Sequence, residues 1–231
     1  MITEFTELQK YFEKNNYIII RKFLPREMAN LLYYHVLISE KVSRFINDDP
    51  ENKHEFNKFN QYGVFNDSQA PGDYSKYAEP IFESLLCQSV KDIENYTGQK
   101  LIPTYTYNRL YTTNTDLKRH KDRPSCEIST TLCLGYDNSN ISKDNESYNW
   151  PMYVGSPDGK VNTKGKPCYL KPGDMIIYRG CKIEHWREPF KGRNHAQVFL
   201  HYNIDNEENK NRLYDTRPLP HLTGNFKTIT E

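Results

Sequence analysis

The sequence contains no long hydrophobic segment. Within its 231 residues, no apolar run approaches the roughly 20 residues that a membrane-spanning helix needs. The first twelve residues carry Glu4, Glu7 and Lys10, where a secretory signal peptide would have its apolar stretch. We therefore expect a soluble, cytoplasmic protein with no signal peptide and no membrane partner.

Cysteine pairs are also missing. The five cysteines form no C-x-x-C motif, and their number is odd. This pattern argues against a zinc ribbon and against a disulfide framework, and it fits reduced thiols in a cytosol. Such free cysteines are expected to be small buried hydrophobic side chains.

The chain has no excess of charge of either sign. Lysine and arginine together number 31 and aspartate and glutamate 30, which gives a net charge of +1. There is thus no general electrostatic reason to expect nucleic acid or an anionic membrane as a partner. Hydrophobic residues make up only 36 % of the chain, but the 13 % that are aromatic supply a core for one compact domain. Nothing in these counts predicts an oligomeric state.

Helical patterns dominate the first hundred residues. The clearest amphipathic stretches are Arg26–Val42 and Ala78–Tyr96, the second followed by Gly98 as a cap. A shorter helix is predicted at Phe5–Lys14, and the β-branched run Tyr17–Ile20 predicts a strand.

Short strands separated by turns follow from residue 101 onward. Pro-Gly turns at Ser156–Gly159 and Lys171–Asp174 separate them, because proline presets φ and glycine accepts a positive φ. Many short strands with such turns predict a β-sandwich or barrel. The predicted strands are Thr104–Tyr111, Ser125–Leu134, Tyr148–Val154, Pro167–Leu170, Asp174–Tyr178 and His195–Asn203.

One short motif carries metal-binding chemistry. His120 and Asp122 lie two residues apart, so in an extended backbone their side chains share one face. An imidazole and a carboxylate are two of the three ligands of a facial triad, which leaves open positions on a non-haem Fe(II). His185 follows a Pro-Gly-Asp turn and a β-rich segment and is the candidate third ligand. Taken alone, the H-x-D tripeptide also fits a surface histidine beside an aspartate in an exposed turn.

The order and spacing of these residues resemble the iron- and 2-oxoglutarate-dependent dioxygenases, particularly the branch similar to prolyl 4-hydroxylases. Residues Tyr17–Leu24 look like the family's entry strand and the turn into its first long helix, and Tyr105–Tyr111 look like the strand before the first ligand. His120–Asp122 matches the H-x-D motif and His185 the distal histidine. The resemblance covers most of the chain.

The resemblance implies a mainly β fold, with a double-stranded β-helix (jelly-roll, cupin-like) core and N-terminal α-helices packed outside it. We expect a single Fe(II)/2-oxoglutarate oxygenase domain over residues 1–231. Its helical N-terminal part is expected at 1–100, the β-helix core at 101–205 and a C-terminal tail at 206–231.

The family also implies an activity. Members use Fe(II), 2-oxoglutarate and O2, with ascorbate as an optional addition, to hydroxylate a C–H bond while releasing succinate and CO2. The likeness to prolyl hydroxylases favours a peptide or protein substrate hydroxylated at proline, and a small molecule or free amino acid is the alternative. A catalytically inactive metal-binding jelly-roll module and a metal-free β-sandwich interaction protein are the hypotheses from other classes.

The residue that anchors the co-substrate departs from the family pattern. Relatives place a lysine or arginine nine to eleven residues after the distal histidine, but His195 stands ten residues after it here, and the nearest strong cation is Arg193. Strand alternation puts Arg193, His195 and Gln197 on one polar face, expected to line the cavity. We predict that Arg193 grips the far carboxylate of 2-oxoglutarate, with His195 or Gln197 assisting or replacing it. The resemblance adds Tyr111 as a hydrogen-bond donor to the co-substrate.

Two residues beside the metal ligands are candidate substrate contacts. Arg123 directly follows the aspartate and should lie at the mouth of the site, where it binds substrate, braces Glu127 or faces solvent. Trp186 directly follows the distal histidine, where it either shields the metal or packs in the core.

The strand before the motif offers two more candidate substrate contacts. Tyr107 and Arg109 alternate in step with Tyr111 and should share its face. Arg109 serves either the substrate or the co-substrate carboxylate, and the tyrosines fit a cross-strand aromatic ladder equally well. The polar stretches 47–75 and 137–149 are candidate mobile covers for the site.

Overall fold

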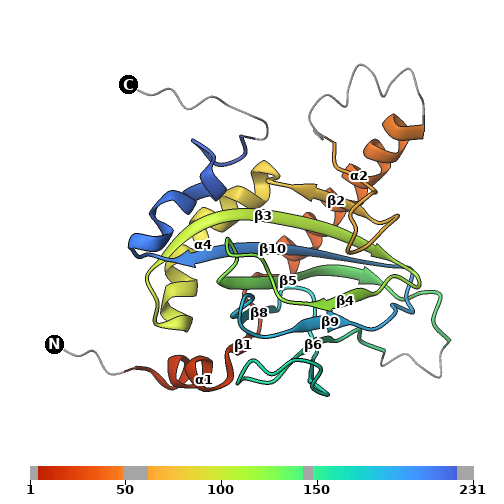
Figure 1. Cartoon of the computed structure of the whole chain (residues 1–231). Coiled ribbons are helices and arrows are strands. Elements are labelled where there is room, and N and C mark those ends of the chain that lie inside the picture. The colour runs from red at the N-terminus through yellow and green to blue at the C-terminus, as the bar shows by residue number, and fades with distance from the viewer. Residues whose placement is uncertain (1–4, 49–61, 143–147, 223–231) are drawn as a thin grey trace.

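The computed structural model describes residues 5–48, 62–142 and 148–222. The strands of this part are β1 (Tyr17–Ile20), β2 (Tyr74–Tyr77), β3 (Leu101–Thr112), β4 (Leu117–His120), β5 (Ile128–Asp137), β6 (Met152–Val154), β7 (Lys166–Cys168), β8 (Met175–Tyr178), β9 (His185–Arg187) and β10 (Asn194–Ile204). They form a six-stranded antiparallel sheet in the order β1-β8-β5-β10-β3-β2 and a four-stranded one in the order β4-β9-β6-β7 (Figure 1). The two sheets make the jelly-roll core that the sequence predicts.

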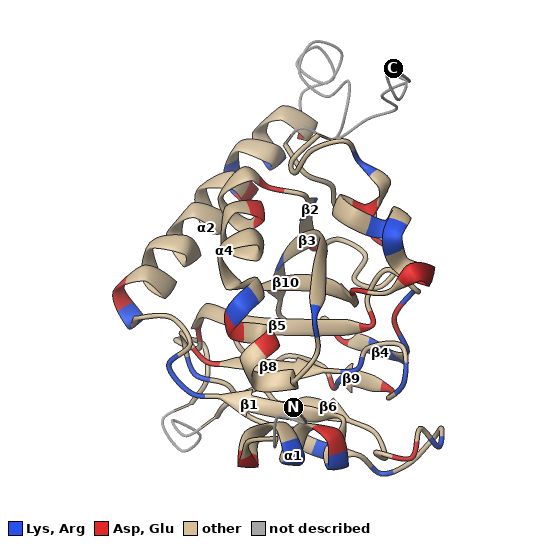
Figure 2. Ribbon diagram, turned by 90° about the vertical axis from the view of Figure 1, so that its left-hand side faces the viewer, with Lys and Arg blue, Asp and Glu red and all other residues tan. Residues whose placement is uncertain are grey.

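The helices lie outside this core, as predicted (Figure 2). Helices α2 (Arg26–Asp48) and α4 (Pro80–Thr97) pack on the outer face of the six-stranded sheet, and α1 (Glu7–Asn15) lies against β1 and α4. Thr6 caps α1 in a capping box with Gln9, which satisfies backbone N–H groups at the helix start. No described helix combines the length and hydropathy that crossing a membrane requires.

Strand β10 separates the two environments of the core. Its residues Ala196, Val198, Leu200 and Tyr202 are fully buried in one hydrophobic cluster with the helices. The alternate residues point between the sheets, where polar groups gather. The predicted alternation of this strand is therefore confirmed from residue 195 to residue 202.

A second hydrophobic cluster fills the space between the sheets. It contains Met152 and Val154 from the four-stranded sheet and Ile176 and Tyr178 from the six-stranded one. Three cysteines are buried, as predicted for free thiols, whereas Cys87 is exposed; the buried ones are Cys126, Cys133 and Cys168.

Some elements differ from the sequence prediction. Strands β2, β4 and β9 were not predicted, because their short sequences are mostly polar or charged and contain no β-branched residue. The tail after residue 205, predicted to have little structure, contains the 3₁₀ helix η2 (Glu207–Thr216). Of the two candidate covers, residues 49–61 and 143–147 lie outside the described part of the chain.

Candidate active site

Two short strands bring two histidines and an aspartate together. His120 ends β4, His185 begins β9, and the antiparallel register places these two residues opposite each other. Oδ1 of Asp122 lies 3.5 Å from Nε2 of His120 and 3.3 Å from Nε2 of His185. One possible ligand atom from each of the three residues lies within 4.8 Å of the others. The predicted triad thus converges on one point.

Backbone and side-chain hydrogen bonds orient each of the three groups. Nδ1 of His120 lies 2.7 Å from the carbonyl oxygen of Lys118, and Nδ1 of His185 lies 3.3 Å from that of Ile183. A ring whose Nδ1–H donates to a carbonyl has its Nε2 lone pair free for a metal. The Ser129 hydroxyl donates to Oδ2 of Asp122 at 2.6 Å, which leaves Oδ1 facing the histidines.

The charges of the site suit a divalent cation. Burial alone would raise the pKa of Asp122, but the adjacent imidazoles of His185 and His120 outweigh it and hold the pKa well below its ordinary value. Two imidazole nitrogens and one ionised carboxylate oxygen are the donor set of the non-haem iron facial triad. The residues present therefore fit an Fe(II) ion.

A glycine makes room for the aspartate. A Cβ on Gly180 would lie 2.1 Å from Oδ2 of Asp122 and 2.5 Å from Oγ of Ser129, closer than such atoms approach. We expect Gly180→Ala to displace the carboxylate and to weaken Ni(II) binding about 10- to 100-fold in a calorimetric titration. The control is Gln88→Ala, at an exposed position of α4 that does not line the pocket described below. Equal Ni(II) affinity of the Gly180→Ala and wild-type proteins would contradict this role.

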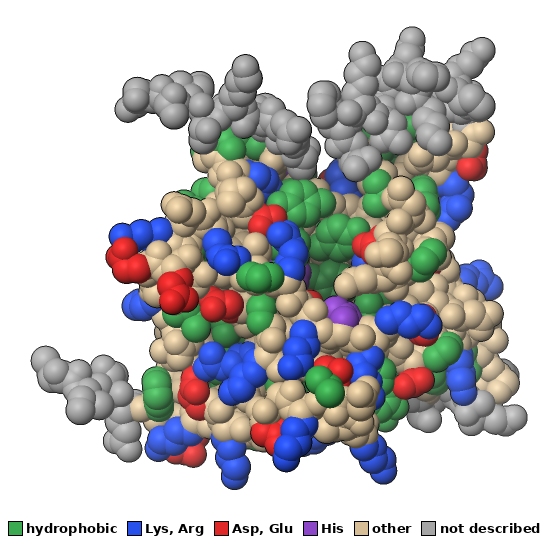
Figure 3. All heavy atoms as spheres, viewed as in Figure 1, with side chains coloured by type: hydrophobic (Ala, Val, Ile, Leu, Met, Phe, Trp, Pro, Cys, Tyr) green, Lys and Arg blue, Asp and Glu red, His purple; other side chains and the backbone are tan. Residues whose placement is uncertain are grey.

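The triad opens into a pocket of about 450 Å³. Figure 3 looks into this hollow, with hydrophobic side chains along its upper part and a histidine at its lower edge. Aromatic rings, arginines and polar groups line it together. The lining residues are Asp67, Ser68, Gln69, Tyr77, Tyr105, Tyr107, Arg109, Leu117, His120, Lys121, Asp122, Arg123, Cys126, His185, Phe199 and His201.

Two predicted residues of β3 line this pocket and share one acid. Nη2 of Arg109 and the hydroxyl of Tyr107 both donate to Oδ2 of Asp67 at 2.6 Å. Arg109 also donates to the hydroxyl of Tyr111 at 3.2 Å, and it is 1 % exposed. The three predicted β3 side chains therefore share a face, while Asp67, which no local sequence signal marked, fixes two of them.

Arg123 lies at the mouth, but it does not brace Glu127. Its guanidinium donates to both carboxylate oxygens of Asp215, at 2.6 and 3.1 Å, and to the Tyr105 hydroxyl at 3.2 Å. Glu127 instead accepts from the backbone of Ile204 and has no contact with Arg123. That alternative prediction is wrong, because the chain after residue 206 folds back and supplies the partner of Arg123.

The backbone that presents Asp215 is strained. Tyr214, Asp215 and Thr216 all have positive φ, at 48°, 57° and 66°. Each such residue costs on the order of 1–3 kcal/mol unless the surroundings fix it. Arg217 supplies the fixation, since its Nη2 lies 2.8 Å from the buried carboxylate of Glu83. The C-terminal segment is thereby held against Arg123 and Tyr77, which line the pocket and pair with Asp215.

The interior behind the metal site contains a cation that the sequence prediction missed. Arg187 lies on β9 two residues after His185, so both side chains point between the sheets. The guanidinium is 2 % exposed, and only Nη1 is paired, with the Trp150 carbonyl at 3.0 Å. Nε and Nη2 have no hydrogen-bond partner among the described residues, and burial lowers the pKa of Arg187. The one signal for this residue is its place two positions after His185, but a strand of three residues is too short to show alternation in the sequence.

The predicted co-substrate residues lie around this interior, with one exception. His195, Gln197 and Tyr111 are buried there, and Oε1 of Gln197 has no partner among the described residues. Arg193 does not join them. It precedes the first residue of β10, its side chain is 64 % exposed, and its Nε lies 3.7 Å from Asp137. The prediction that Arg193 faces inward is wrong, because strand alternation does not extend to it.

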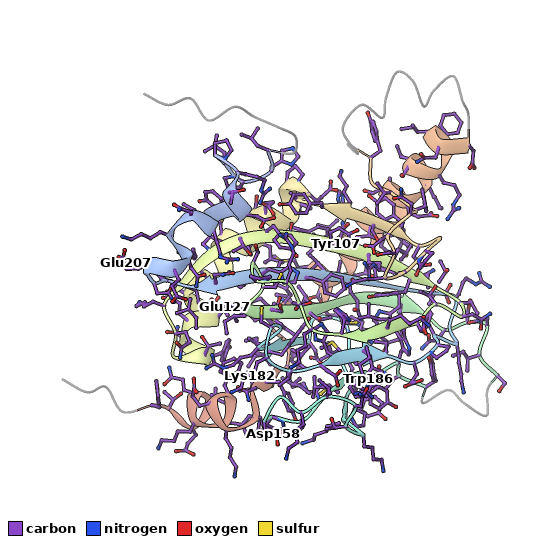
Figure 4. The ribbon with its side chains drawn as sticks, in the orientation of Figure 1. Tyr107, Glu127, Asp158, Lys182, Trp186 and Glu207 are labelled. Atoms are coloured by element: carbon purple, nitrogen blue, oxygen red, sulfur yellow. The ribbon has the colours of Figure 1, made fainter. Side chains whose placement is uncertain are left out.

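Trp186 packs outside the pocket. It lies between His185 and Arg187 on β9, so its ring points away from the pocket (Figure 4). The ring stacks on that of Tyr153, with the two ring centroids 5.4 Å apart. The guanidinium carbon of Arg119 lies over the Trp186 ring, 3.3 Å from its centroid. Of the two roles that the sequence leaves open for Trp186, the structure shows packing, and Trp186 is not among the residues that line the pocket.

A buried histidine beside the site makes stability depend on pH. Burial lowers the pKa of His201 from 6.5 to about 4. Below pH 6.5 the unfolded chain binds a proton that native His201 does not, so acid destabilises the fold. When the pH falls from 7 to about 4, we expect the unfolding free energy to decrease by roughly 3 kcal/mol because of this residue. In urea titrations across this pH range, the unfolding free energy of His201→Gln should not show this decrease. An unfolding free energy that depends on pH in the same way in the variant and the wild type would contradict the prediction.

Comparison with known proteins shows which fold the chain shares. The sequence matches no protein-family model and no curated protein. The fold, however, is that of the 2-oxoglutarate- and Fe(II)-dependent oxygenases, which are its neighbours among solved structures.

Three of these neighbours show the range of proteins that share the fold. A prolyl-4-hydroxylase from Pseudomonas putida has 13 % identity and a TM-score of 0.53, over 86 % of this chain and 98 % of that one. HygX from Streptomyces hygroscopicus, solved with nickel, 2-oxoglutarate and hygromycin B, has 10 % identity and a TM-score of 0.58, over 87 % and 88 %. The α-ketoglutarate-dependent epimerase SnoN from nogalamycin biosynthesis has 10 % identity and a TM-score of 0.58, over 85 % and 81 %.

Proposed function

We propose that the protein is an Fe(II)- and 2-oxoglutarate-dependent dioxygenase that hydroxylates a C–H bond and releases succinate and CO2. The observation that carries this proposal is the convergence of His120, Asp122 and His185, whose Nε2 and Oδ1 atoms face one another on an oxygenase fold. Iron bound there with 2-oxoglutarate and O2 supplies the oxidising chemistry. The chain supplies the ligand geometry, the anchor for the co-substrate and the walls that exclude water.

Arg187 replaces Arg193 as our assignment for the co-substrate anchor. A guanidinium with two unpaired donors, buried between the sheets on the same face of β9 as His185, fits a carboxylate brought in by a ligand. Without such a partner it is an isolated buried charge, which is costly. Tyr111 lies in the same interior, and we keep it, with His195 and Gln197, as a co-substrate contact.

For the substrate we propose a peptidyl proline. The pocket mouth carries the rings of Tyr77, Tyr105 and Tyr107, flat apolar surfaces on which a pyrrolidine ring can pack. Arg123 and Arg109 beside them are the candidate polar contacts. A small molecule is the alternative, because a cavity of about 450 Å³ holds a ligand of drug size.

The test is a substrate panel with two readouts. The Fe(II)-loaded protein is incubated with 2-oxoglutarate, O2 and ascorbate, with proline-rich peptides in one arm and free amino acids and other small molecules in the second. Succinate and a mass gain of one oxygen are measured. We expect both signals with a peptide, and the added oxygen on proline. Signals only in the second arm would overturn the peptide proposal, and tight metal binding without succinate in any arm would favour an inactive binding module.

A further inference from the structure

The outward face of α2 carries apolar side chains that the pocket does not use. The opposite face of the helix packs on the six-stranded sheet through Leu32 and Val36. On the outward face, Leu31, Ile38 and Phe45 are 69 %, 60 % and 72 % exposed. We name this surface the α2 stripe; it consists of Met28, Leu31, Tyr34, Ile38, Val42 and Phe45.

The stripe is continuous and uncharged over most of its length. No lysine, arginine, aspartate or glutamate occurs between residues 28 and 39. In Figure 2 this part of α2 runs along the outer edge of the molecule beside α4. A contiguous apolar patch of this kind on a protein surface marks an interaction site more often than chance.

The spacing of the stripe is that of a helix that packs on another helix. Leu31, Ile38 and Phe45 repeat every seven residues. Met28 and Val42 stand fourteen apart in the other position of the same pattern, and the residue midway between them is His35, whose Nε2 lies 3.4 Å from the carboxylate of Glu79. These are the a and d positions of a heptad, which insert between side chains of a facing helix. The sequence therefore carries a helix-packing seam on the face that the sheet does not cover.

We propose that a second copy of this chain covers the α2 stripe, with the two α2 helices packed antiparallel in a symmetric dimer. In this arrangement Met28 lies opposite Phe45 of the second copy, Leu31 opposite its Val42 and His35 opposite its Ile38. The same contacts recur on the other side of the symmetry axis. Antiparallel packing also brings the positive end of each helix dipole beside the negative end of the other.

The stripe supplies most of the area that such a dimer needs. The six side chains of the stripe expose on the order of 600 Å² per copy, against about 800 Å² per partner in an interface of standard size. Neighbouring exposed groups such as Lys41 and Glu27 supply the polar rim of the contact.

The oligomeric state of the full chain tests this proposal. In sedimentation velocity we expect the wild type to be a dimer and the Leu31→Glu/Ile38→Glu variant a monomer, because burying four carboxylates in the seam is prohibitive. Asn30→Glu adds a charge to the same helix away from the stripe and should remain a dimer. Far-UV circular dichroism and Ni(II) affinity should be the same in all three. A monomeric wild type, which leaves the stripe to another occupant, or a dimeric double variant would overturn the proposal.

Cysteine cross-linking tests the antiparallel direction. In a Cys87→Ser background, the Leu31→Cys/Val42→Cys variant should form a covalent dimer on mild oxidation. Leu31→Cys alone should not, since the two cysteines would lie about 16 Å apart along the helices. Cross-linking by the single variant would show parallel helices and overturn the arrangement.

Discussion

Asp122→Ala is expected to abolish succinate formation and to weaken Ni(II) binding by more than about 100-fold. The substitution removes the one anionic ligand and leaves two neutral imidazoles, and the loss should exceed the 10- to 100-fold that removal of an outer hydrogen-bond partner costs. Calorimetric titration with Ni(II) and a succinate assay with Fe(II) measure the two effects.

The matched control for this variant is Asp116→Ala. Asp116 precedes β4, and its carboxylate pairs with Lys118 at the surface instead of facing the histidines. Asp116→Ala should leave both Ni(II) binding and succinate formation unchanged. Unchanged turnover in Asp122→Ala would remove this carboxylate from the metal and contradict the assigned triad.

Arg187→Met is expected to raise the dissociation constant of 2-oxoglutarate from the Ni(II)-loaded protein by at least about 100-fold. Truncating one partner of a buried charged pair costs about 2–5 kcal/mol. Because Nε and Nη2 of Arg187 have no partner among the described residues, the substitution should not lower the unfolding free energy of the ligand-free protein. Calorimetry and urea denaturation test the two statements separately.

Two controls isolate the far carboxylate. Arg193→Met alters an exposed arginine and should change the dissociation constant less than about twofold. 2-Oxobutyrate lacks the far carboxylate, so wild type and Arg187→Met should bind it alike. A large loss in Arg193→Met with none in Arg187→Met would restore the anchor that sequence reasoning chose.

The metal triad could be predicted because its signal is local. His120 and Asp122 are fixed relative to each other by a two-residue spacing, and the strand patterns around them predict the return of His185 to the same end of the core. The alternation along β3 and β10 was equally visible, since each strand is long enough to show it.

The anchor could not be predicted because its strand is too short. With only three residues, β9 shows no alternation in the sequence, so Arg187 was not recognised as facing the same way as His185. Arg193 was chosen instead, although β10 begins one residue after it. The acids Asp67 and Asp215 come from distant segments, and only the folded chain brings them to Arg109 and Arg123.

A crystal structure of the protein with Ni(II) and 2-oxoglutarate is the most direct test of the site. We predict that Nε2 of His120, Oδ1 of Asp122 and Nε2 of His185 bind the metal, and that the far carboxylate accepts hydrogen bonds from Nε and Nη2 of Arg187. A metal bound away from these three side chains, or a far carboxylate held by a different cation, would contradict the account.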